Sequence, residues 1–357
     1  MLRTKQYKDV LLLIAVSLIL FIITNTLLKD DNSHADTKRR LKVETVVLKS
    51  PDSTDRFEGE KRAIFLISFG EEAAQSTLVE RAVMSIRRRG EFIGPVIVLT
   101  DAPLQRYKGV FDENVIVMNH VRKHLKLNYF KYEAVKYKRF KTYIMDYIDF
   151  VPELKDVEWV YYMDIDILLG APLVPFIQEL ESKYNIQPPD LDESAVSAPS
   201  KLYFFKNMEY ARRSFYANSG FFIAHRESSR ECLTIWRNRM NKRPTEKFDQ
   251  ASINSIVRRT LDGLNNRCIV TAMELENYES YPTHEEQFIE MVENESYTPL
   301  IHILNSCISK KFTDEATEEF VANVLMLSKE ERKEHKYGKE IVSPSKSVEW
   351  TKKLKTS

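Results

Sequence analysis

The stretch that decides the fold is Tyr161–Gly170, YYMDIDILLG, in which Asp164 and Asp166 interrupt an otherwise apolar run. Side chains alternate between the two faces of a strand, so both carboxylates are expected on one face, with Cα atoms about 6.6 Å apart. A buried carboxylate costs several kcal/mol unless a cation or hydrogen-bond donors compensate it. The segment therefore predicts a strand that carries two carboxylates to the edge of a sheet.

This carboxylate pair has two interpretations. In an open α/β sheet, ligands bind beyond the carboxyl ends of the strands, and the hard cations Mn²⁺ and Mg²⁺ prefer oxygen ligands. The first interpretation makes Asp164 and Asp166 the ligands of such a cation. In the second, the two aspartates cap a turn and face water.

The residues before this stretch alternate between strand and helix patterns. Apolar runs at Arg62–Gly70, Gly94–Pro103 and Asn114–His120 predict buried strands. Between the first two, Ser76–Gly90 has helical spacing, with a serine near its start and a glycine at its end. The order strand–helix–strand predicts an α/β fold with parallel strands and right-handed crossovers.

Composition sets the broad class of the protein. The 357 residues are 43% hydrophobic and 29% charged, with a net charge of +1. This is enough for one large or two modest domains, and it gives no bulk charge for binding nucleic acid. Three cysteines, Cys232, Cys268 and Cys307, permit one disulfide in an oxidising compartment, without identifying the pair.

The N-terminal region contains an uncharged apolar segment, Val10–Leu28. Its length suits one membrane-spanning helix, which needs about 20 apolar residues. Arg3, Lys5 and Lys8 precede it, so the positive-inside rule places residues 1–9 in the cytosol and the rest in a lumen. We expect an uncleaved signal-anchor in the Golgi or endoplasmic reticulum membrane, since the span is short. A cleaved signal peptide and a buried helix remain the alternatives.

The remaining chain divides by composition. Residues 29–60 are polar and predict a stem, residues 61–312 predict the folded domain, and residues 313–357 predict a charged helix and tail. Asn294-Glu295-Ser296 is an N-glycosylation acceptor pattern, usable only on the lumenal side.

These features carry a resemblance. The segment Trp159–Leu173, WVYYMDIDILLGAPL, resembles the D-x-D segment of GT-A-fold nucleotide-sugar glycosyltransferases, nearest the retaining glycogenin-like and galactosyl-/xylosyltransferase groups. The resemblance covers about residues 61–312. It implies a Rossmann-like, mostly parallel sheet and Mn²⁺- or Mg²⁺-dependent transfer of a sugar. The donor would be a UDP- or GDP-sugar and the acceptor a glycan or glycoprotein, with retained configuration.

The same resemblance assigns roles to later residues. Asn218, followed by Ser219 and Gly220, matches a strand that lies below the sugar and the acceptor, although a plain β-turn explains it too. Asp249 and Gln250 match an Asp-Gln pair near the acceptor or the sugar; the alternative for Asp249 is a helix N-cap. His302 matches the third metal ligand, and its alternative is a core histidine.

Three lysines are candidates for binding the donor. Tyr129–Phe150 has a helical apolar stripe, and Lys141 falls on the edge of that stripe with Lys138 at its flank. The resemblance implies that a basic residue here contacts the nucleotide-sugar, Lys141 first and Lys138 second; otherwise these lysines reach out to water. Lys310 aligns loosely with a lysine that contacts the diphosphate.

The ends of the first two strands are expected to line the nucleotide pocket. The residues concerned are Ser68, Phe69 and Gly70 after the first strand and Thr100 and Asp101 after the second. Two other functions stay open. One is a non-catalytic, membrane-anchored binding protein on the same fold, and the other is a haloacid-dehalogenase-type phosphatase, which also has a D-x-D motif. The chain is expected to be anchored by its single apolar segment, to bind no nucleic acid, and to be a possible homodimer.

Overall fold

A computed structural model describes thirteen stretches of the chain, which are residues 57–69, 77–102, 104–107, 109–119, 138–187, 199–206, 217–242, 249–261, 267–274, 278–280, 282, 285–303 and 315–334. Val10–Leu28 and nearly all of the expected stem lie outside these ranges, as do Gly70, Cys307 and Lys310. In the described ranges, the helices are all too short or too polar to cross a bilayer.

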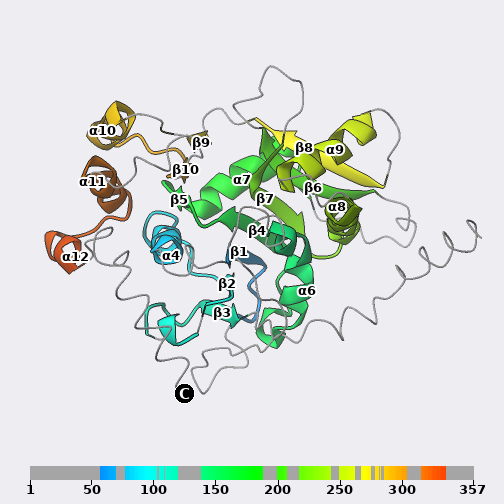
Figure 1. Cartoon of the computed structure of the whole chain (residues 1–357), viewed down its shortest axis with the longest axis horizontal. Helices are drawn as coiled ribbons and strands as arrows, with labels where there is room; N and C mark the ends of the chain where they lie inside the picture. The colour runs from blue at the N-terminus through cyan, green and yellow to red at the C-terminus, as the bar shows by residue number, and fades with distance from the viewer. Residues whose placement is uncertain are drawn as a thin grey trace, which may run out of the picture. The chain divides into compact units, whose positions relative to one another are not determined.

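A seven-stranded sheet forms the centre of the fold, in the order β3-β2-β1-β4-β7-β6-β8 (Figure 1). β1 pairs in parallel with β2 and β4, β2 pairs in parallel with β3, and β7 runs antiparallel between β4 and β6. The sheet is therefore mixed and mostly parallel, as predicted. Its strands are β1 (Arg62–Ser68), β2 (Val96–Thr100), β3 (Val115–Asn119), β4 (Trp159–Asp164), β6 (Ser200–Lys206), β7 (Ala217–His225) and β8 (Cys268–Met273).

Helices cover both faces of this sheet, which is why β2, β3 and β4 are almost continuously apolar. On one face, α4 (Leu78–Arg88) and α7 (Leu173–Tyr184) pack against alternate side chains of β4 such as Tyr161. On the other face, aromatic side chains of the sheet meet Tyr147 of α6 (Ile144–Asp149) and Trp236 of α8 (Arg230–Lys242). Figure 1 shows α4 and α6 on opposite sides of β1 and β4.

The remaining helical segments lie between these strands along the chain or after the last of them. They are η1 (Leu104–Tyr107), η2 (Arg139–Tyr143), α6 (Ile144–Asp149), η3 (Pro152–Leu154), α8 (Arg230–Lys242), α9 (Asp249–Leu261), α10 (Glu285–Glu293), α11 (Glu315–Val324) and α12 (Lys329–Glu334). The helix expected over Tyr129–Phe150 is described from Lys138 onward. There it is a 3₁₀ segment followed by a short α-helix, and it ends at Asp149, before Pro152.

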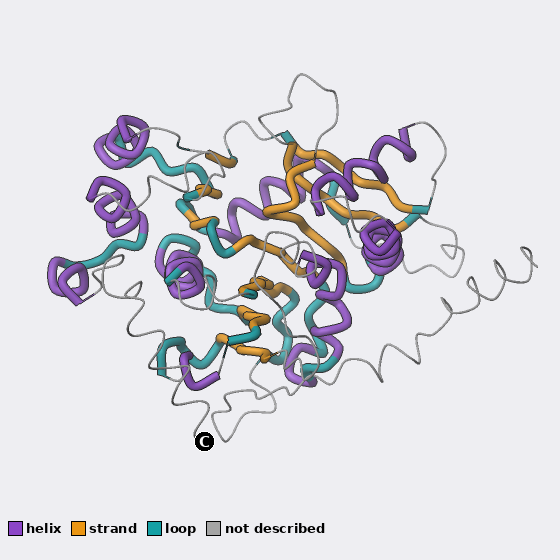
Figure 2. Tube along the Cα trace, in the orientation of Figure 1, coloured by secondary structure: helices purple, strands orange, loops and turns teal. Residues whose placement is uncertain are grey.

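A second, three-stranded sheet lies beside the first; strands are orange in Figure 2. It consists of β5 (Ile167–Leu169), β10 (Leu300–His302) and β9 (Glu279–Ser280), in the order β5-β10-β9. Phe320 and neighbouring residues of α11 pack with Leu168 of β5 and Ile301 of β10. The C-terminal helix is thus part of the same compact unit as the sheets.

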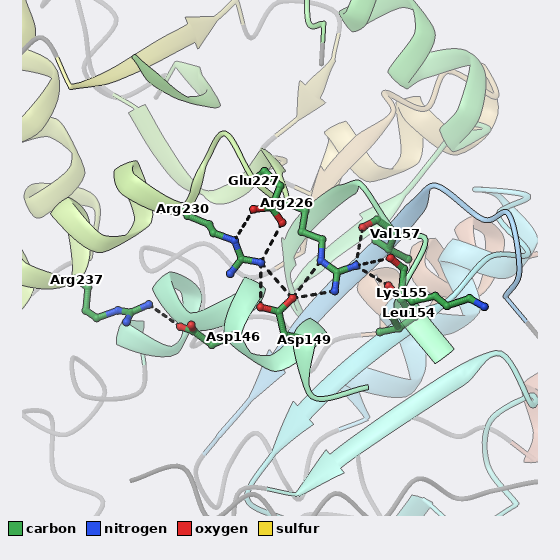
Figure 3. Close-up of polar contacts among 9 residues, drawn as sticks. All are labelled: Asp146, Asp149, Leu154, Lys155, Val157, Arg226, Glu227, Arg230 and Arg237. Carbon is green, nitrogen blue, oxygen red and sulfur yellow. Dashed lines mark hydrogen bonds and ion pairs between the residues drawn. The ribbon is translucent and has the colours of Figure 1, made fainter. Parts of the chain in front are cut away.

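A cluster of three arginines, Arg226, Arg230 and Arg237, ties α6 to the turn after β7 and to α8 (Figure 3). Arg237 donates to the Thr142 carbonyl and to Asp146, each at 2.7 Å, and its guanidinium lies 3.6 Å from the centre of the Tyr143 ring. Asp149 accepts from Arg226 at 2.8 Å. These contacts hold in place the segment that carries Lys138 and Lys141.

One disulfide joins α8 to β8. The Cys232 and Cys268 sulfurs are bonded across a sequence separation of 36, and both residues are fully buried. The sequence predicted a single bridge but could not choose the pair, because pairing depends on the distance between strands and helices in space.

Candidate functional site

The carboxyl ends of four parallel strands meet at one edge of the main sheet. Ser68 pairs with Thr100, Thr100 pairs with Asn119, and Ile67 pairs with Asp164. The predicted donor-binding positions at the ends of β1 and β2 therefore share an edge with the D-x-D segment, as expected for an open α/β sheet.

The D-x-D segment differs from its prediction in one respect. β4 ends at Asp164, and Asp166 lies in the turn that leads to β5. Strand alternation correctly places Asp164 on the face of Tyr162, whose hydroxyl donates to it, but it does not extend to Asp166. The turn orients Asp166 instead, and its backbone carbonyl accepts from the Ile303 amide at 2.9 Å.

Gly220 in β7 is the point where the predicted residues converge. A Cβ built on Gly220 would lie 3.2 Å from His302 Cε1, 3.3 Å from Asn218 Oδ1 and 3.4 Å from Asp164 Oδ2. A side chain here would crowd His302 and Asn218 and touch Asp164, whereas glycine leaves the space to them. The structure thus brings together residues that are distant in the sequence.

Lys141 points into the protein and is 3% exposed. Its Nζ atom lies 2.9 Å from Asp164 Oδ1 and 2.8 Å from Asp249 Oδ2, and it donates to the Ser219 carbonyl at 3.0 Å. Burial lowers the pKa of Lys141, but the two carboxylates outweigh burial and raise it above its usual value. Lys141 therefore stays charged and joins β4, β7 and α9, which excludes the alternative in which it reaches water.

Asp249 is the first residue of α9 and is 1% exposed. It accepts from Ser219 Oγ at 2.8 Å, and Lys138 Nζ lies 3.3 Å from its other oxygen. Burial raises its pKa, but Lys141 and Lys138 outweigh burial and hold the pKa well below the usual range. In this arrangement Asp249 anchors the lysines, and its neighbour Gln250 is half-buried.

Asp166 and His302 both have raised pKa values, although burial acts in opposite directions on the two groups. Burial and the nearby Asp164 carboxylate raise the pKa of Asp166 to about 6, against an opposing effect of His302. Burial lowers the pKa of His302, but Glu279 and the two aspartates outweigh burial and raise it. Asp164 and His302 therefore both act on Asp166, whose pKa stays raised although His302 and Lys141 oppose the rise.

Two residues of the site were absent from the predicted set. Glu279 of β9 contacts His302 Nε2 and accepts from Asn218 Nδ2 at 3.2 Å. A single glutamate in a polar segment has no sequence signal. Tyr162 had one, because it precedes Asp164 by two positions and so shares its face of the strand.

The residues expected to line the nucleotide pocket differ in their burial and in their contacts. Ser68 is fully buried, and its hydroxyl has no hydrogen-bond partner among the residues the structure describes. Phe69 stacks on Phe140, with ring centroids 4.8 Å apart. Thr100 Oγ1 accepts from the Ala102 amide at 3.0 Å and so shapes the turn, while Asp101 is half-buried.

The donor set suits a hard divalent cation in its chemistry, with two carboxylates and one imidazole. The raised pKa of Asp166, caused by burial and by the Asp164 carboxylate, is what an added cation would relieve. Across the described ranges, however, no three His, Cys, Asp or Glu side chains are already arranged to hold a metal ion. Asp164, Asp166 and His302 would have to move closer to share one.

The chain was compared with known proteins. It matches no protein-family model and no curated protein. Among solved structures it is similar to the glycosyltransferase GlyE of Streptococcus pneumoniae TIGR4, at 15% identity over 74% of this chain and 61% of that one, with a TM-score of 0.45. It is similar to the galactosyltransferase LgtC in complex with donor and acceptor sugar analogs, at 13% identity over 74% and 96%, with a TM-score of 0.47. This chain therefore spans less than two thirds of the length of GlyE.

Proposed function

We propose that this chain transfers a sugar from a UDP- or GDP-sugar to a hydroxyl of a glycan or glycoprotein, with the help of Mn²⁺ or Mg²⁺ and with retained configuration. The observation that carries the proposal is the convergence of Asp164, Asn218 and His302 on Gly220, at the carboxyl edge of the parallel strands. This is the edge at which α/β sheets bind nucleotides.

The difficult part of such a reaction is the negative charge that develops on the leaving diphosphate. A divalent cation bound by Asp164, Asp166 and His302 would act there as a Lewis acid. The permanent charge of Lys141, fixed by Asp164 and Asp249, adds positive potential beside the same carboxylates. Glycine at position 220 leaves room for the side chains of His302, Asn218 and Asp164 to meet.

The location follows from the same proposal. We place the chain in the Golgi or endoplasmic reticulum membrane, anchored by Val10–Leu28, with its folded domain in the lumen. The disulfide between Cys232 and Cys268 fits an oxidising compartment. Asn294, the glycosylation acceptor position, is exposed in the turn after α10 and accessible to a glycan.

Binding and hydrolysis of nucleotide-sugars test the proposal. Thermal unfolding of the full-length chain is measured with UDP-, GDP- and CMP-sugars, with and without Mn²⁺, and release of the nucleoside diphosphate is followed in parallel. We expect stabilisation by one donor class, and Mn²⁺-dependent hydrolysis that falls by about 10²–10³-fold in Asp166→Asn, the loss typical of removing one charge-stabilising group.

The competing functions give different results. Hydrolysis of phosphomonoesters with no response to nucleotide-sugars would instead identify a phosphatase. Absence of both cation and nucleotide binding would identify a non-catalytic protein on this fold. As a control, Glu274→Gln removes an exposed carboxylate that pairs with Lys206, and neither residue is assigned to the site, so its hydrolysis should equal that of the unaltered chain.

A further inference from the structure

Glu279 is a carboxylate buried beside the site. Its side chain has no exposed surface. One of its oxygens, Oε1, contacts His302 Nε2 and also accepts from Asn218 Nδ2 at 3.2 Å. A single oxygen thus links the predicted metal ligand in β10 to the predicted sugar-contacting residue in β7.

The second oxygen of Glu279 is unusual. Oε2 is buried and has no hydrogen-bond partner among the residues the structure describes. A buried carboxylate oxygen without a partner opposes folding, because the group has lost its water. Such a residue is poorly chosen for stability alone, which points to a role in function.

The contact with Glu279 orients the imidazole ring of His302. A carboxylate accepts hydrogen bonds, so Nε2 carries a hydrogen and Nδ1 holds the lone pair of the neutral ring. Histidines that bind metals commonly donate their other ring N–H to a carboxylate, which fixes the tautomer and makes the ring a better ligand. The ring edge at Cε1 lies beside Gly220, on the side where Asp164 Oδ2 also lies.

We propose that Glu279 is a positioning residue that fixes His302 for a divalent cation and Asn218 for the donor sugar. The inference rests on the proposed function. Because the side chain is fully buried, Glu279 acts through His302 and Asn218 and does not touch the substrate. A cation held by His302 also compensates the buried negative charge, so Glu279 favours the cation-bound protein over the free one.

The variant Glu279→Gln tests this role, since it removes the charge and keeps the shape and an acceptor oxygen. Mn²⁺ binding to the full-length chain is measured by calorimetry, and thermal unfolding is measured in a chelator. We expect the dissociation constant for Mn²⁺ to rise about 10–100-fold, while the midpoint of unfolding in chelator stays the same or rises. Glu274→Gln, the matched surface control, should change neither.

A double variant shows whether the effect passes through His302. In His302→Ala, adding Glu279→Gln should weaken Mn²⁺ binding no further; a further loss would overturn the proposal.

Unchanged Mn²⁺ affinity in Glu279→Gln, with a lower unfolding midpoint, would make Glu279 merely structural and leave the proposed function standing. If the unaltered chain binds neither Mn²⁺ nor any nucleotide-sugar, both proposals are wrong. If it binds the nucleotide-sugar without Mn²⁺, only the role of Glu279 is overturned.

Discussion

Lys141 Nζ lies 2.9 Å from Asp164 Oδ1, so a fully charged lysine from the segment before the D-x-D strand rests against the first aspartate of that motif. The lysine is 3% exposed, and the same Nζ also contacts Asp249. One buried cation therefore holds two carboxylates from different parts of the chain. The contacts within the site therefore also contribute to the stability of the fold.

Removing that cation should be costly. Lys141→Met leaves the carboxylates of Asp164 and Asp249 without their shared partner, and we expect the free energy of unfolding to fall by about 3–5 kcal/mol. Urea denaturation measures the change. The control is Lys138→Met, which removes a lysine that is 39% exposed and pairs with the same Asp249. Its effect should stay below about 1 kcal/mol, and equal losses in the two variants would contradict the assigned role of Lys141.

Adding a methyl group at Gly220 should lower both the stability of the fold and the affinity for the cation and the donor. In Gly220→Ala the new methyl group must displace His302 and Asn218 by a few tenths of an ångström, since their nearest atoms lie 3.2 Å and 3.3 Å away, and it would touch Asp164 Oδ2 at 3.4 Å. We expect a loss of about 1–3 kcal/mol in stability and a clear loss of Mn²⁺ and donor affinity. Calorimetry and urea denaturation measure the two effects.

Gly170→Ala provides the comparison for Gly220→Ala. Its new methyl group would lie 2.3 Å from the Thr298 carbonyl oxygen, a backbone atom that cannot easily move. We expect a larger loss of stability from Gly170→Ala than from Gly220→Ala. Donor affinity in Gly220→Ala equal to that of the unaltered chain would show that the cation and the donor bind elsewhere.

His225 should make stability depend on pH. Burial lowers its pKa, and its Nδ1 accepts from the Ser228 amide at 3.2 Å, a contact that needs the neutral ring. As pH falls below about 6.5 the unfolded chain gains this proton before the folded chain does, so stability present at neutral pH is lost toward the lower folded pKa. His225→Asn keeps an acceptor and does not titrate. The change in unfolding free energy between about pH 8 and about pH 5 should therefore be smaller in the variant, and identical pH dependence would count against this protonation behaviour.

The disulfide should contribute substantially to stability. It closes a loop with a sequence separation of 36, which corresponds to about 4 kcal/mol in the chain-entropy treatment. We expect the double variant Cys232→Ala, Cys268→Ala to lose stability of that order in urea denaturation, and reductant to have a similar effect on the unaltered chain. Cys307→Ser should retain the full stability under oxidising conditions. A loss in that variant as large as in the double variant would argue for a different bridge.

The arginines of Figure 3 should contribute unequally to the stability of the fold. Arg237→Lys loses the planar group that bonds the Thr142 carbonyl and Asp146 and lies over the Tyr143 ring, and we expect a loss of about 1–2 kcal/mol. Arg230→Lys alters more exposed pairs with Asp149 and should cost under about 1 kcal/mol. Thermal unfolding compares the two, and the reverse order would show that η2 is held by other contacts.

Much of the fold was readable from local patterns. The apolar runs of β1, β2 and β3 predict strands buried on both faces, and the spacing of about 3.6 residues in α4 predicts a helix with one buried face. The end of β4 was harder to place. A strand and the turn after it can share an alternating pattern, so Asp166 was assigned to a strand that ends at Asp164.

The sequence by itself determined the residue types of the site: two aspartates after an apolar run, a lysine on the edge of a helical stripe, and a histidine in a late strand. Only the tertiary structure decided their partners. Lys141 meets carboxylates of its own chain, Cys232 bonds Cys268, and Glu279 lies beside His302. These contacts join residues far apart along the chain, and no local periodicity carries information about them, because they arise only when strands and helices pack in three dimensions.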